Sequence, residues 1–271
     1  MPENKTVLYK GSEIFYEVYG NQKPVLILLH GFAETGAVWF HQTAYLQKKF
    51  TVIRPDLPGC GKSAELNIEA SKTTIDDYAN AVFAIIENEN INRCIIIGHS
   101  MGGYITLAIA ENHPEILSAF GFVHSTAFAD SEEKKQNRLR GIEMIENYGS
   151  HTFIKNTTPN LFTQSFKNTH AAEIEQLIEQ GKFFSKKSLQ QCYYAMMNRP
   201  SRTNILKNSK IPVLFIAGKQ DNAVSLNDIL KQVHLPEISY IHIINNAGHM
   251  GMWEAVHTVN EYVEEFVNDT A

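Results

Sequence analysis

Apolar runs and helical stripes alternate over the first part of the chain. The short apolar runs are residues 25–30, 51–55, 95–97 and 117–124. Runs rich in β-branched residues are typical of strands buried on both faces of a sheet. Between them, apolar residues such as Tyr78, Val82 and Ile86 recur at helical spacing. Residues 14–19 alternate in polarity, as an antiparallel strand does. The pattern predicts an α/β fold, a mostly parallel central sheet with helices on both faces.

The alternation stops between residues 125 and 210. This stretch holds three apolar helical faces instead, within residues 139–145, 174–178 and 189–197. Strand-like runs return at residues 212–221 and 238–244, and an amphipathic helix follows them. We therefore expect one core, formed by residues 1–124 and 211–271, that is interrupted by a helical insertion at residues 125–210.

Composition and charge narrow the possible partners. The 271 residues include 24 Lys+Arg and 29 Asp+Glu, a net charge of −5. We therefore expect a small-molecule substrate and neither nucleic acid nor a membrane as partner. Cys60, Cys94 and Cys192 lack metal-type spacing and favour a reducing compartment. Because the sequence shows no signal-peptide pattern and no apolar run of membrane-spanning length, we expect a cytoplasmic protein. These features do not indicate the oligomeric state.

One short motif carries candidate chemistry. Residues 98–102 read GHSMG, the pattern G-x-S-x-G, where the apolar run 95–97 gives way to a helical stripe. Small flanking residues let the chain double back sharply, which raises the serine hydroxyl above the sheet. Ser100 is therefore a candidate nucleophile. A serine hydroxyl is weakly nucleophilic at neutral pH, so it also needs a base, an orienting acid and donors for an oxyanion.

Other candidates come just after other predicted strands. Ligands in open parallel sheets bind beyond the carboxyl ends of the strands. One apolar run leads into Phe32, the next-to-last strand leads into Asp221, and the last strand leads to His249. Ser100, Asp221 and His249 also follow one another in the chain order that one catalytic-triad topology requires.

Together these motifs resemble the α/β-hydrolase superfamily over nearly the whole chain. The matching segments are HGF from residue 30, PDLPGCGKS from residue 55, GHSMGG from residue 98, AGKQD ending at residue 221 and NAGHM around residue 249. The resemblance implies that Ser100 is the nucleophile, that His249 is the general base and that Asp221 is the acid that orients it. It also implies that the backbone N–H groups of Phe32 and Met101 form the oxyanion hole.

The same resemblance implies that residues 125–210 form a helical cap and that the reaction needs no cofactor and no metal. Asp130 remains an alternative acid, because some relatives place the acid after the preceding strand, although a solvated carboxylate is the simpler interpretation. His99 and His30 are expected to support their loops. The segment GCGKS lacks the full spacing of a phosphate-binding loop, so nucleotide binding is not expected.

The substrate is less well defined. A serine nucleophile in GHSMGG resembles esterases, whereas carbon–carbon bond hydrolases commonly carry asparagine before the serine. We expect a small apolar or aromatic carboxylic ester. The cap is rich in aromatic residues and methionines that can line an apolar pocket or hold the cap together: Phe153, Phe162, Phe166, Phe183, Phe184, Tyr193, Tyr194, Met196 and Met197. A lactone, a thioester or a carbon–carbon bond stays open as substrate, as does a receptor role with little turnover.

Overall fold

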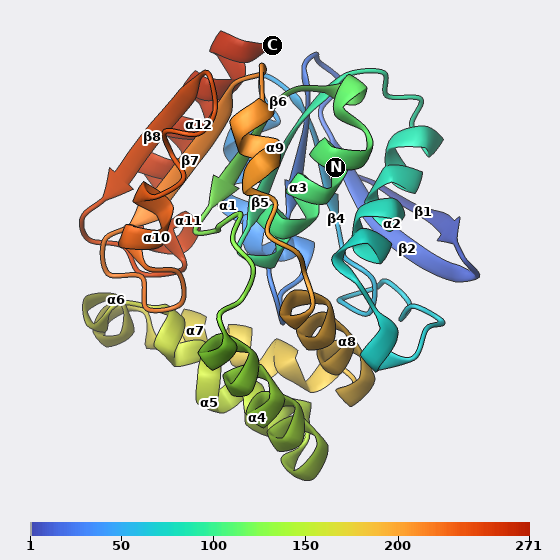
Figure 1. Ribbon diagram of the computed structural model, residues 1–271, viewed down its shortest axis with the longest axis vertical. Helices are drawn as coiled ribbons and strands as arrows, with labels where there is room; N and C mark the ends of the chain where they lie inside the picture. Colours follow the sequence, from blue (N-terminus) through green and yellow to red (C-terminus); the bar gives the residue numbers. More distant parts are fainter. Residues whose placement is uncertain (1) are drawn as a thin grey trace.

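The computed structural model describes residues 2–271 and has an eight-stranded sheet at its centre (Figure 1). The strands lie in the order β1-β2-β4-β3-β5-β6-β7-β8. Strand β2 pairs antiparallel with β1 and β4, and the other pairs are parallel. The predicted mostly parallel sheet is therefore confirmed. The strands are β1 (Glu3–Tyr9), β2 (Ser12–Tyr19), β3 (Val25–Leu29), β4 (Thr51–Pro55), β5 (Cys94–His99), β6 (Leu117–Val123), β7 (Val213–Gly218) and β8 (Ser239–Ile244).

Helices cover both faces of the sheet, and β5 illustrates how. Ile96 belongs to the buried cluster that contains residues of α2 and α3, whereas Ile95 and Ile97 belong to the cluster that contains residues of α1 and α12. The run of isoleucines is thus buried on both faces, as predicted. The core helices are η1 (Gly36–Trp39), α1 (Phe40–Leu46), η2 (Ala70–Lys72), α2 (Ile75–Asn88), α3 (Met101–Asn112), η3 (Pro114–Ile116), α10 (Leu226–Leu230), α11 (Gly251–Glu254) and α12 (Val256–Thr270).

A run of helices connects β6 to β7. These are α4 (Glu132–Tyr148), α5 (Ser150–Thr157), η4 (Thr158–Leu161), α6 (Gln164–Thr169), α7 (Ala171–Gln180), η5 (Gly181–Phe183), α8 (Lys186–Met197) and α9 (Thr203–Asn208). In Figure 1, α4 to α8 lie together at one end of the sheet, while α9 lies beside α3. Just before α9, Arg202 donates to Glu111 of α3 over 2.7 Å. Helix α9 is therefore attached to the core side of the molecule.

Strand β1 was not predicted from the sequence. Its side chains alternate between exposed and partly buried positions, so it contains no apolar run. It joins the sheet at the edge by pairing with β2 across a turn at Lys10 and Gly11, whose φ angles are 48° and 82°. Main-chain hydrogen bonds, which leave no trace in hydrophobic patterning, place this strand.

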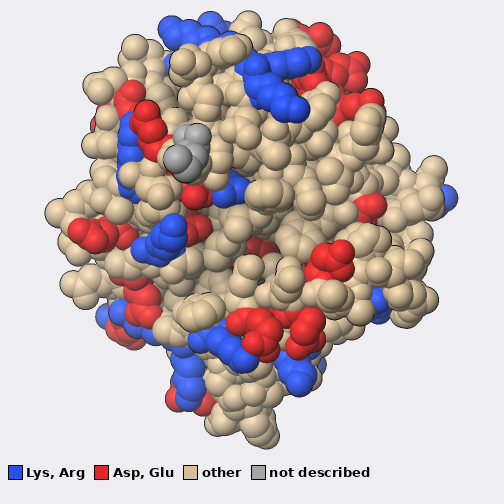
Figure 2. Space-filling model, turned by 180° about the vertical axis from the view of Figure 1, so that it is seen from behind, with Lys and Arg blue, Asp and Glu red and all other residues tan. Residues whose placement is uncertain are grey.

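Charges of both signs are interspersed on the surface. Figure 2 shows Lys and Arg close to Asp and Glu across one face, with large uncharged areas between them. Several neighbours form ion pairs, such as Lys210 with Glu237 and Lys231 with Asp228. Within residues 2–271, none of the helices reaches the length and hydropathy of a membrane span.

Gly98→Ala is expected to destabilise the fold strongly. A Cβ on Gly98 would lie 2.2 Å from the carbonyl carbon and oxygen of Gly102 in α3. Because backbone atoms cannot move without shifting the helix, we expect a loss of more than about 3 kcal/mol of unfolding free energy. Gly11→Ala is the control, since a Cβ there meets nothing within 4 Å and adds only the strain of its positive φ. Equal losses in chemical denaturation of the two variants would contradict the steric explanation.

Candidate active site

Ser100 occupies the sharp turn between β5 and α3. Its φ of 49° and ψ of −113° lie outside the regions that residues with side chains ordinarily adopt. Two hydrogen bonds hold the turn: Ser100 N donates to the Val123 carbonyl over 3.0 Å, and Ser125 Oγ donates to the Ser100 carbonyl over 2.7 Å. This strained strand-to-helix turn is the geometry expected of G-x-S-x-G.

The loops after β7 and β8 bring Asp221 and His249 together. His249 Nδ1 lies 2.8 Å from Asp221 Oδ2, and both residues are buried. The other carboxylate oxygen of Asp221 accepts hydrogen bonds from the backbone N–H groups of Ala223 (2.8 Å) and Val224 (2.9 Å). The carboxylate is thus fixed on one side by its own loop and directs the other oxygen at the imidazole.

The pKa values of this pair move apart. Burial alone would raise the pKa of Asp221, but the charge of His249 and hydrogen bonds to His249 and His124 outweigh it and hold that pKa well below its usual range. Burial would lower the pKa of His249, but the charge and hydrogen bond of Asp221 outweigh it and raise that pKa above 6.5. Asp221 is therefore ionised and stabilises the imidazolium form of His249.

His124 is a neighbour of this pair that sequence reasoning missed. It follows β6, has a φ of 53° and places Nδ1 3.3 Å from Asp221 Oδ2. Its Nε2 accepts the backbone N–H of Gly251 over 3.1 Å, so the ring proton lies on Nδ1, the atom that faces Asp221. Burial lowers the pKa of His124 to about 4 despite the nearby carboxylate. The neutral ring therefore helps to position Asp221 without competing for the proton.

His124, Asp221 and His249 also meet the spacing of a metal site, since their ligating atoms lie within 4.8 Å of one another. Hydrogen bonds already account for this arrangement. Asp221 Oδ2 lies 2.8 Å from His249 Nδ1 and 3.3 Å from His124 Nδ1, and His124 Nε2 accepts the backbone N–H of Gly251. The donor set fits a hydrogen-bonded dyad with a supporting histidine.

A second buried pair, Glu34 and His99, lies next to the dyad. Glu34 Oε2 accepts from Gly31 N (2.6 Å) and lies 3.0 Å from His99 Nδ1, while His99 Nε2 lies 2.9 Å from the His249 carbonyl oxygen. Contacts with His99 and His30 outweigh burial and lower the pKa of Glu34, so its negative charge persists and helps to raise the pKa of His249. His99 is hydrogen-bonded, as expected, but no motif in the sequence singled out Glu34.

The loop after β3 places the candidate oxyanion donors. No hydrogen bond from Phe32 N or Met101 N to another backbone or side-chain group is found among residues 2–271, and the Met101 amide lies at the N-terminus of α3, where such groups are free. His30 holds the loop, because its ring nitrogens contact the Gly31 carbonyl (2.8 Å) and Leu57 N (2.9 Å). A Cβ on Gly31 would lie 3.2 Å from that of Ser100. Glycine at this position therefore keeps the space beside the Ser100 side chain open.

These elements meet in a pocket of about 140 Å³. Its walls come from the loops after β3, β5, β7 and β8 and from the helices that follow β6. The lining residues are Phe32, Glu34, Ser100, Tyr104, Arg138, Leu161, Tyr193, Met196, Ala223, Val224 and His249. Ser100 and His249 therefore face one small cavity, and Asp221 lies behind His249.

Comparison with known proteins agrees with the fold. The model of the α/β hydrolase fold family matches residues 24–144, and solved hydrolase structures superpose on the whole chain. The chain has the α/β-hydrolase fold. The structure of a thermophilic esterase from Thermogutta terrifontis with malate bound has a TM-score of 0.90 and 24% identity, covering 100% of this chain and 99% of that one.

Curated relatives of this chain are hydrolases whose names give different substrates. A putative carbamate hydrolase, RutD, from Yersinia enterocolitica is 24% identical over 84% of each chain. A 2-hydroxy-6-oxononadienedioate/2-hydroxy-6-oxononatrienedioate hydrolase from Burkholderia vietnamiensis is 24% identical over 96% of this chain and 93% of its own. The fold therefore does not by itself define the substrate.

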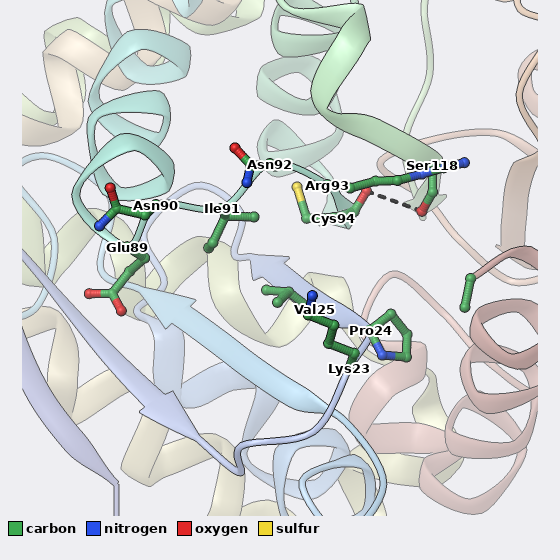
Figure 3. Close-up of a pocket in the computed structure, with 11 residues that line it drawn as sticks. Lys23, Pro24, Val25, Glu89, Asn90, Ile91, Asn92, Arg93, Cys94 and Ser118 are labelled. Carbon is green, nitrogen blue, oxygen red and sulfur yellow. Dashed lines mark hydrogen bonds between the residues drawn. The ribbon is translucent and has the colours of Figure 1, made fainter.

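A larger pocket, of about 560 Å³, lies at the amino ends of the strands. Figure 3 shows it between the start of β3, the loop before β5 and Ser118 of β6. The Ser118 hydroxyl donates to the Cys94 carbonyl over 3.4 Å. None of Ser100, Asp221 and His249 lines this pocket. It lies at the edge of the sheet opposite the carboxyl ends of the strands, where ligands of open parallel sheets bind.

The expectation that Asp130 is a solvated carboxylate is wrong. Asp130 is 5% exposed and forms ion pairs with Arg138 and with Arg199 Nη1, the latter over 2.8 Å. Those two arginines lie on α4 and just after α8, so the ion pairs tie together the two ends of the helical insertion. Each oxygen of the Asp130 carboxylate therefore pairs with an arginine. The carboxylate that contacts the His249 ring is that of Asp221.

The acid limb of the pH–rate profile is expected to have its midpoint above pH 6.5, because His249 must be neutral to accept a proton and its pKa is raised above that value. Activity should therefore rise with pH through this pKa. Glu34→Gln removes a negative charge near His249. It should lower the midpoint of the acid limb, measured as kcat/KM against pH, by about half a pH unit or more. The exposed Glu87→Gln is the control. An unchanged midpoint in Glu34→Gln would show that the Glu34 charge does not act on His249.

Proposed function

We propose that this α/β-hydrolase is a serine hydrolase that cleaves a small carboxylic ester through an acyl-enzyme intermediate. The observation that carries the proposal is the 2.8 Å contact between His249 and the buried Asp221, with His249 and Ser100 lining one pocket. Ser100 is proposed as nucleophile, His249 as general base and Asp221 as the acid that orients it. This arrangement matches the roles that ester hydrolysis by a serine requires.

Each half-reaction transfers one proton through His249. Ser100 Oγ attacks the ester carbonyl while His249 takes its proton, and the tetrahedral oxyanion accepts hydrogen bonds from Phe32 N and Met101 N. The intermediate collapses as His249 returns the proton to the leaving alcohol. Water then attacks the acyl-enzyme with His249 as base, and breakdown of the second intermediate releases the acid and restores the Ser100 hydroxyl.

Helices α4 to α8 are proposed to act as a cap over this pocket. Three of them or their connections supply lining residues: Arg138 from α4, Leu161 from η4, and Tyr193 from α8. The Tyr193 ring stacks on Phe32 at a centroid distance of 4.4 Å, and His249 N donates to the Leu161 carbonyl over 2.8 Å. A cap in contact with both the oxyanion loop and the histidine loop can exclude water and fix the substrate.

The ester is favoured because Ser100 and His249 line one small pocket, and because a structural relative at TM-score 0.90 is an esterase. The other relatives act on a carbamate or on a 2-hydroxy-6-oxo dienedioate. A lactone, a thioester and a carbon–carbon bond remain the alternative substrates of the same triad, and a receptor with little turnover is the alternative role.

Turnover of p-nitrophenyl butyrate by the wild-type protein tests the proposal. The proposal expects continuous release of p-nitrophenol over many equivalents, and Ser100→Ala should release none above background. A receptor with little turnover would instead release at most one equivalent and then stop. Failure of the wild-type protein to release any p-nitrophenol would remove ester hydrolysis as the function.

Chain length should matter strongly in the same assay. A cavity of about 140 Å³ is close to the roughly 150 Å³ that accommodates benzene in an engineered core. Longer acyl chains must displace packed side chains such as Met196, so kcat/KM for p-nitrophenyl octanoate should fall at least about tenfold below that for the butyrate. Met196→Ala should narrow the difference. Equal rates for both chain lengths in the wild-type protein would contradict an acyl pocket limited to this volume.

A further inference from the structure

The candidate pocket contains a cation that the triad chemistry does not use. Arg138 of α4 lines the cavity together with Ser100 and His249. Its Nε donates to Asp130 Oδ2, and its Nη2 lies 3.5 Å from Asp130 Oδ1. No hydrogen bond from Arg138 Nη1 is found among residues 2–271. One edge of this guanidinium is thus committed to Asp130 while another is free to donate.

The charges in this cluster do not balance. Asp130 is shared by two guanidinium groups, because Arg199 Nη1 donates to Asp130 Oδ1 over 2.8 Å. Two positive charges and one negative charge leave one positive charge in excess in this cluster. The other carboxylate of the pocket, Glu34, is engaged by Gly31 N and His99. The Asp130 side chain is 1% exposed, and those of Arg199 and Arg138 are 3% and 18% exposed. Arg138 is the less buried of the two guanidinium groups, so its excess positive charge is accessible from the pocket and can pair with an anion there.

Aromatic rings hold Arg138 in place beside the reacting atoms. The guanidinium lies 5.4 Å from the centroid of the Tyr193 ring, and that ring stacks on Phe32 at 4.4 Å. On the other side of Asp130, the Arg199 guanidinium lies 3.8 Å from the centroid of the Tyr104 ring. The stacked rings of Tyr193 and Phe32 therefore hold the Arg138 guanidinium on the same side of the pocket as Phe32, the proposed oxyanion donor.

We propose that Arg138 binds a carboxylate at the far end of the acyl group, so that the preferred substrate is a monoester of a short dicarboxylic acid. This inference rests on the proposed ester hydrolysis. A guanidinium with a free edge suits a carboxylate better than a neutral group does. The cavity limits the length of the acyl group between the ester carbonyl and this carboxylate. Its volume of about 140 Å³ holds roughly as many non-hydrogen atoms as benzene has. The acyl part of glutarate beyond its ester carbonyl is of that size.

A matched pair of substrates tests the preference. Monomethyl glutarate and its amide counterpart, methyl 5-amino-5-oxopentanoate, differ only in a carboxylate that becomes a carboxamide. Hydrolysis followed by proton release should show a kcat/KM for the anionic ester about 10- to 100-fold higher in the wild-type protein. Arg138→Gln should abolish this ratio, mainly through the KM of the anionic ester, and Arg138→Lys should retain part of it.

Lys135→Gln is the matched control, because Lys135 lies one turn earlier on α4 and pairs with the exposed Glu132. It removes the same charge from the same helix and should keep the wild-type ratio. The proposal would be overturned if the wild-type protein had similar kcat/KM values for the two esters. It would also be overturned if Arg138→Gln kept the wild-type preference for the anionic ester. Melting temperatures of all variants report whether the fold is retained.

Binding of free glutarate separates this inference from the proposed reaction. Calorimetry with the Ser100→Ala protein should detect glutarate but not glutaramide, and adding Arg138→Gln should weaken glutarate binding at least about tenfold. If the wild-type protein hydrolyses neither ester but glutarate binding depends on Arg138, the proposed function fails and the anion site stands. Glutarate binding that is absent, or unaffected by Arg138→Gln, would overturn the anion site even if neutral esters are hydrolysed.

Discussion

Replacing Ser100 with alanine is expected to lower kcat for ester hydrolysis by roughly 10⁵- to 10⁶-fold, because the covalent intermediate can no longer form. His249→Ala should have an effect of the same order, since Ser100 then lacks the base that takes its proton. Both side chains face the pocket from loops beyond the sheet, so the melting temperature should change little.

The double variant shows whether Ser100 and His249 act as one catalytic unit or contribute independently to the rate. Ser100 and His249 act on the same proton, so combining Ser100→Ala with His249→Ala should cost little beyond either single change. The measurement is single-turnover hydrolysis of an activated p-nitrophenyl ester by each protein at equal concentration. Multiplicative losses would mean that the two side chains do not act as one unit.

Asp221→Asn is expected to lower kcat by about 10⁴-fold at neutral pH with little change in substrate binding. An amide at this position can present its N–H₂ group to His249 Nδ1, which favours the wrong tautomer of the ring. Asp221 Oδ1 would remain available to the N–H groups of Ala223 and Val224, so the loop should keep its shape. Steady-state kinetics across pH report this loss.

Asp130→Asn is the counterpart that tests the alternative acid. Its carboxylate pairs with Arg138 and Arg199, and breaking these buried ion pairs should cost about 3 kcal/mol of unfolding free energy. The rate of the folded protein on neutral esters should fall by less than about tenfold, because His249 keeps Asp221. A large loss of rate in Asp130→Asn with near-normal rates in Asp221→Asn would reverse the assignment.

The fold and the candidate triad could be predicted because both follow local rules. The apolar runs marked the buried strands, and chemistry in a parallel sheet gathers where those strands end. Ser100, Asp221 and His249 each follow a different strand, and the adjacency of β7 and β8 brings the last two within 2.8 Å of each other. Their catalytic roles remain predictions.

The supporting residues could not be predicted in this way. Glu34 becomes significant only because the loop after β3 folds its carboxylate against His99, 65 residues further along the chain. His124 reads as the end of an apolar strand, and its contact with Asp221 depends on the pairing of β6 with β7. Arg138 lies on a helix that is rich in charged residues, so only the tertiary structure singles out the one that faces the pocket.

Mass spectrometry of the protein after reaction with a fluorophosphonate tests the central claim most directly, because the probe reports an activated oxygen whatever the natural substrate is. The account predicts one adduct, on the peptide that carries Ser100, formed far more slowly in His249→Ala and absent in Ser100→Ala. An adduct on another serine, or labelling that survives in Ser100→Ala, would contradict it.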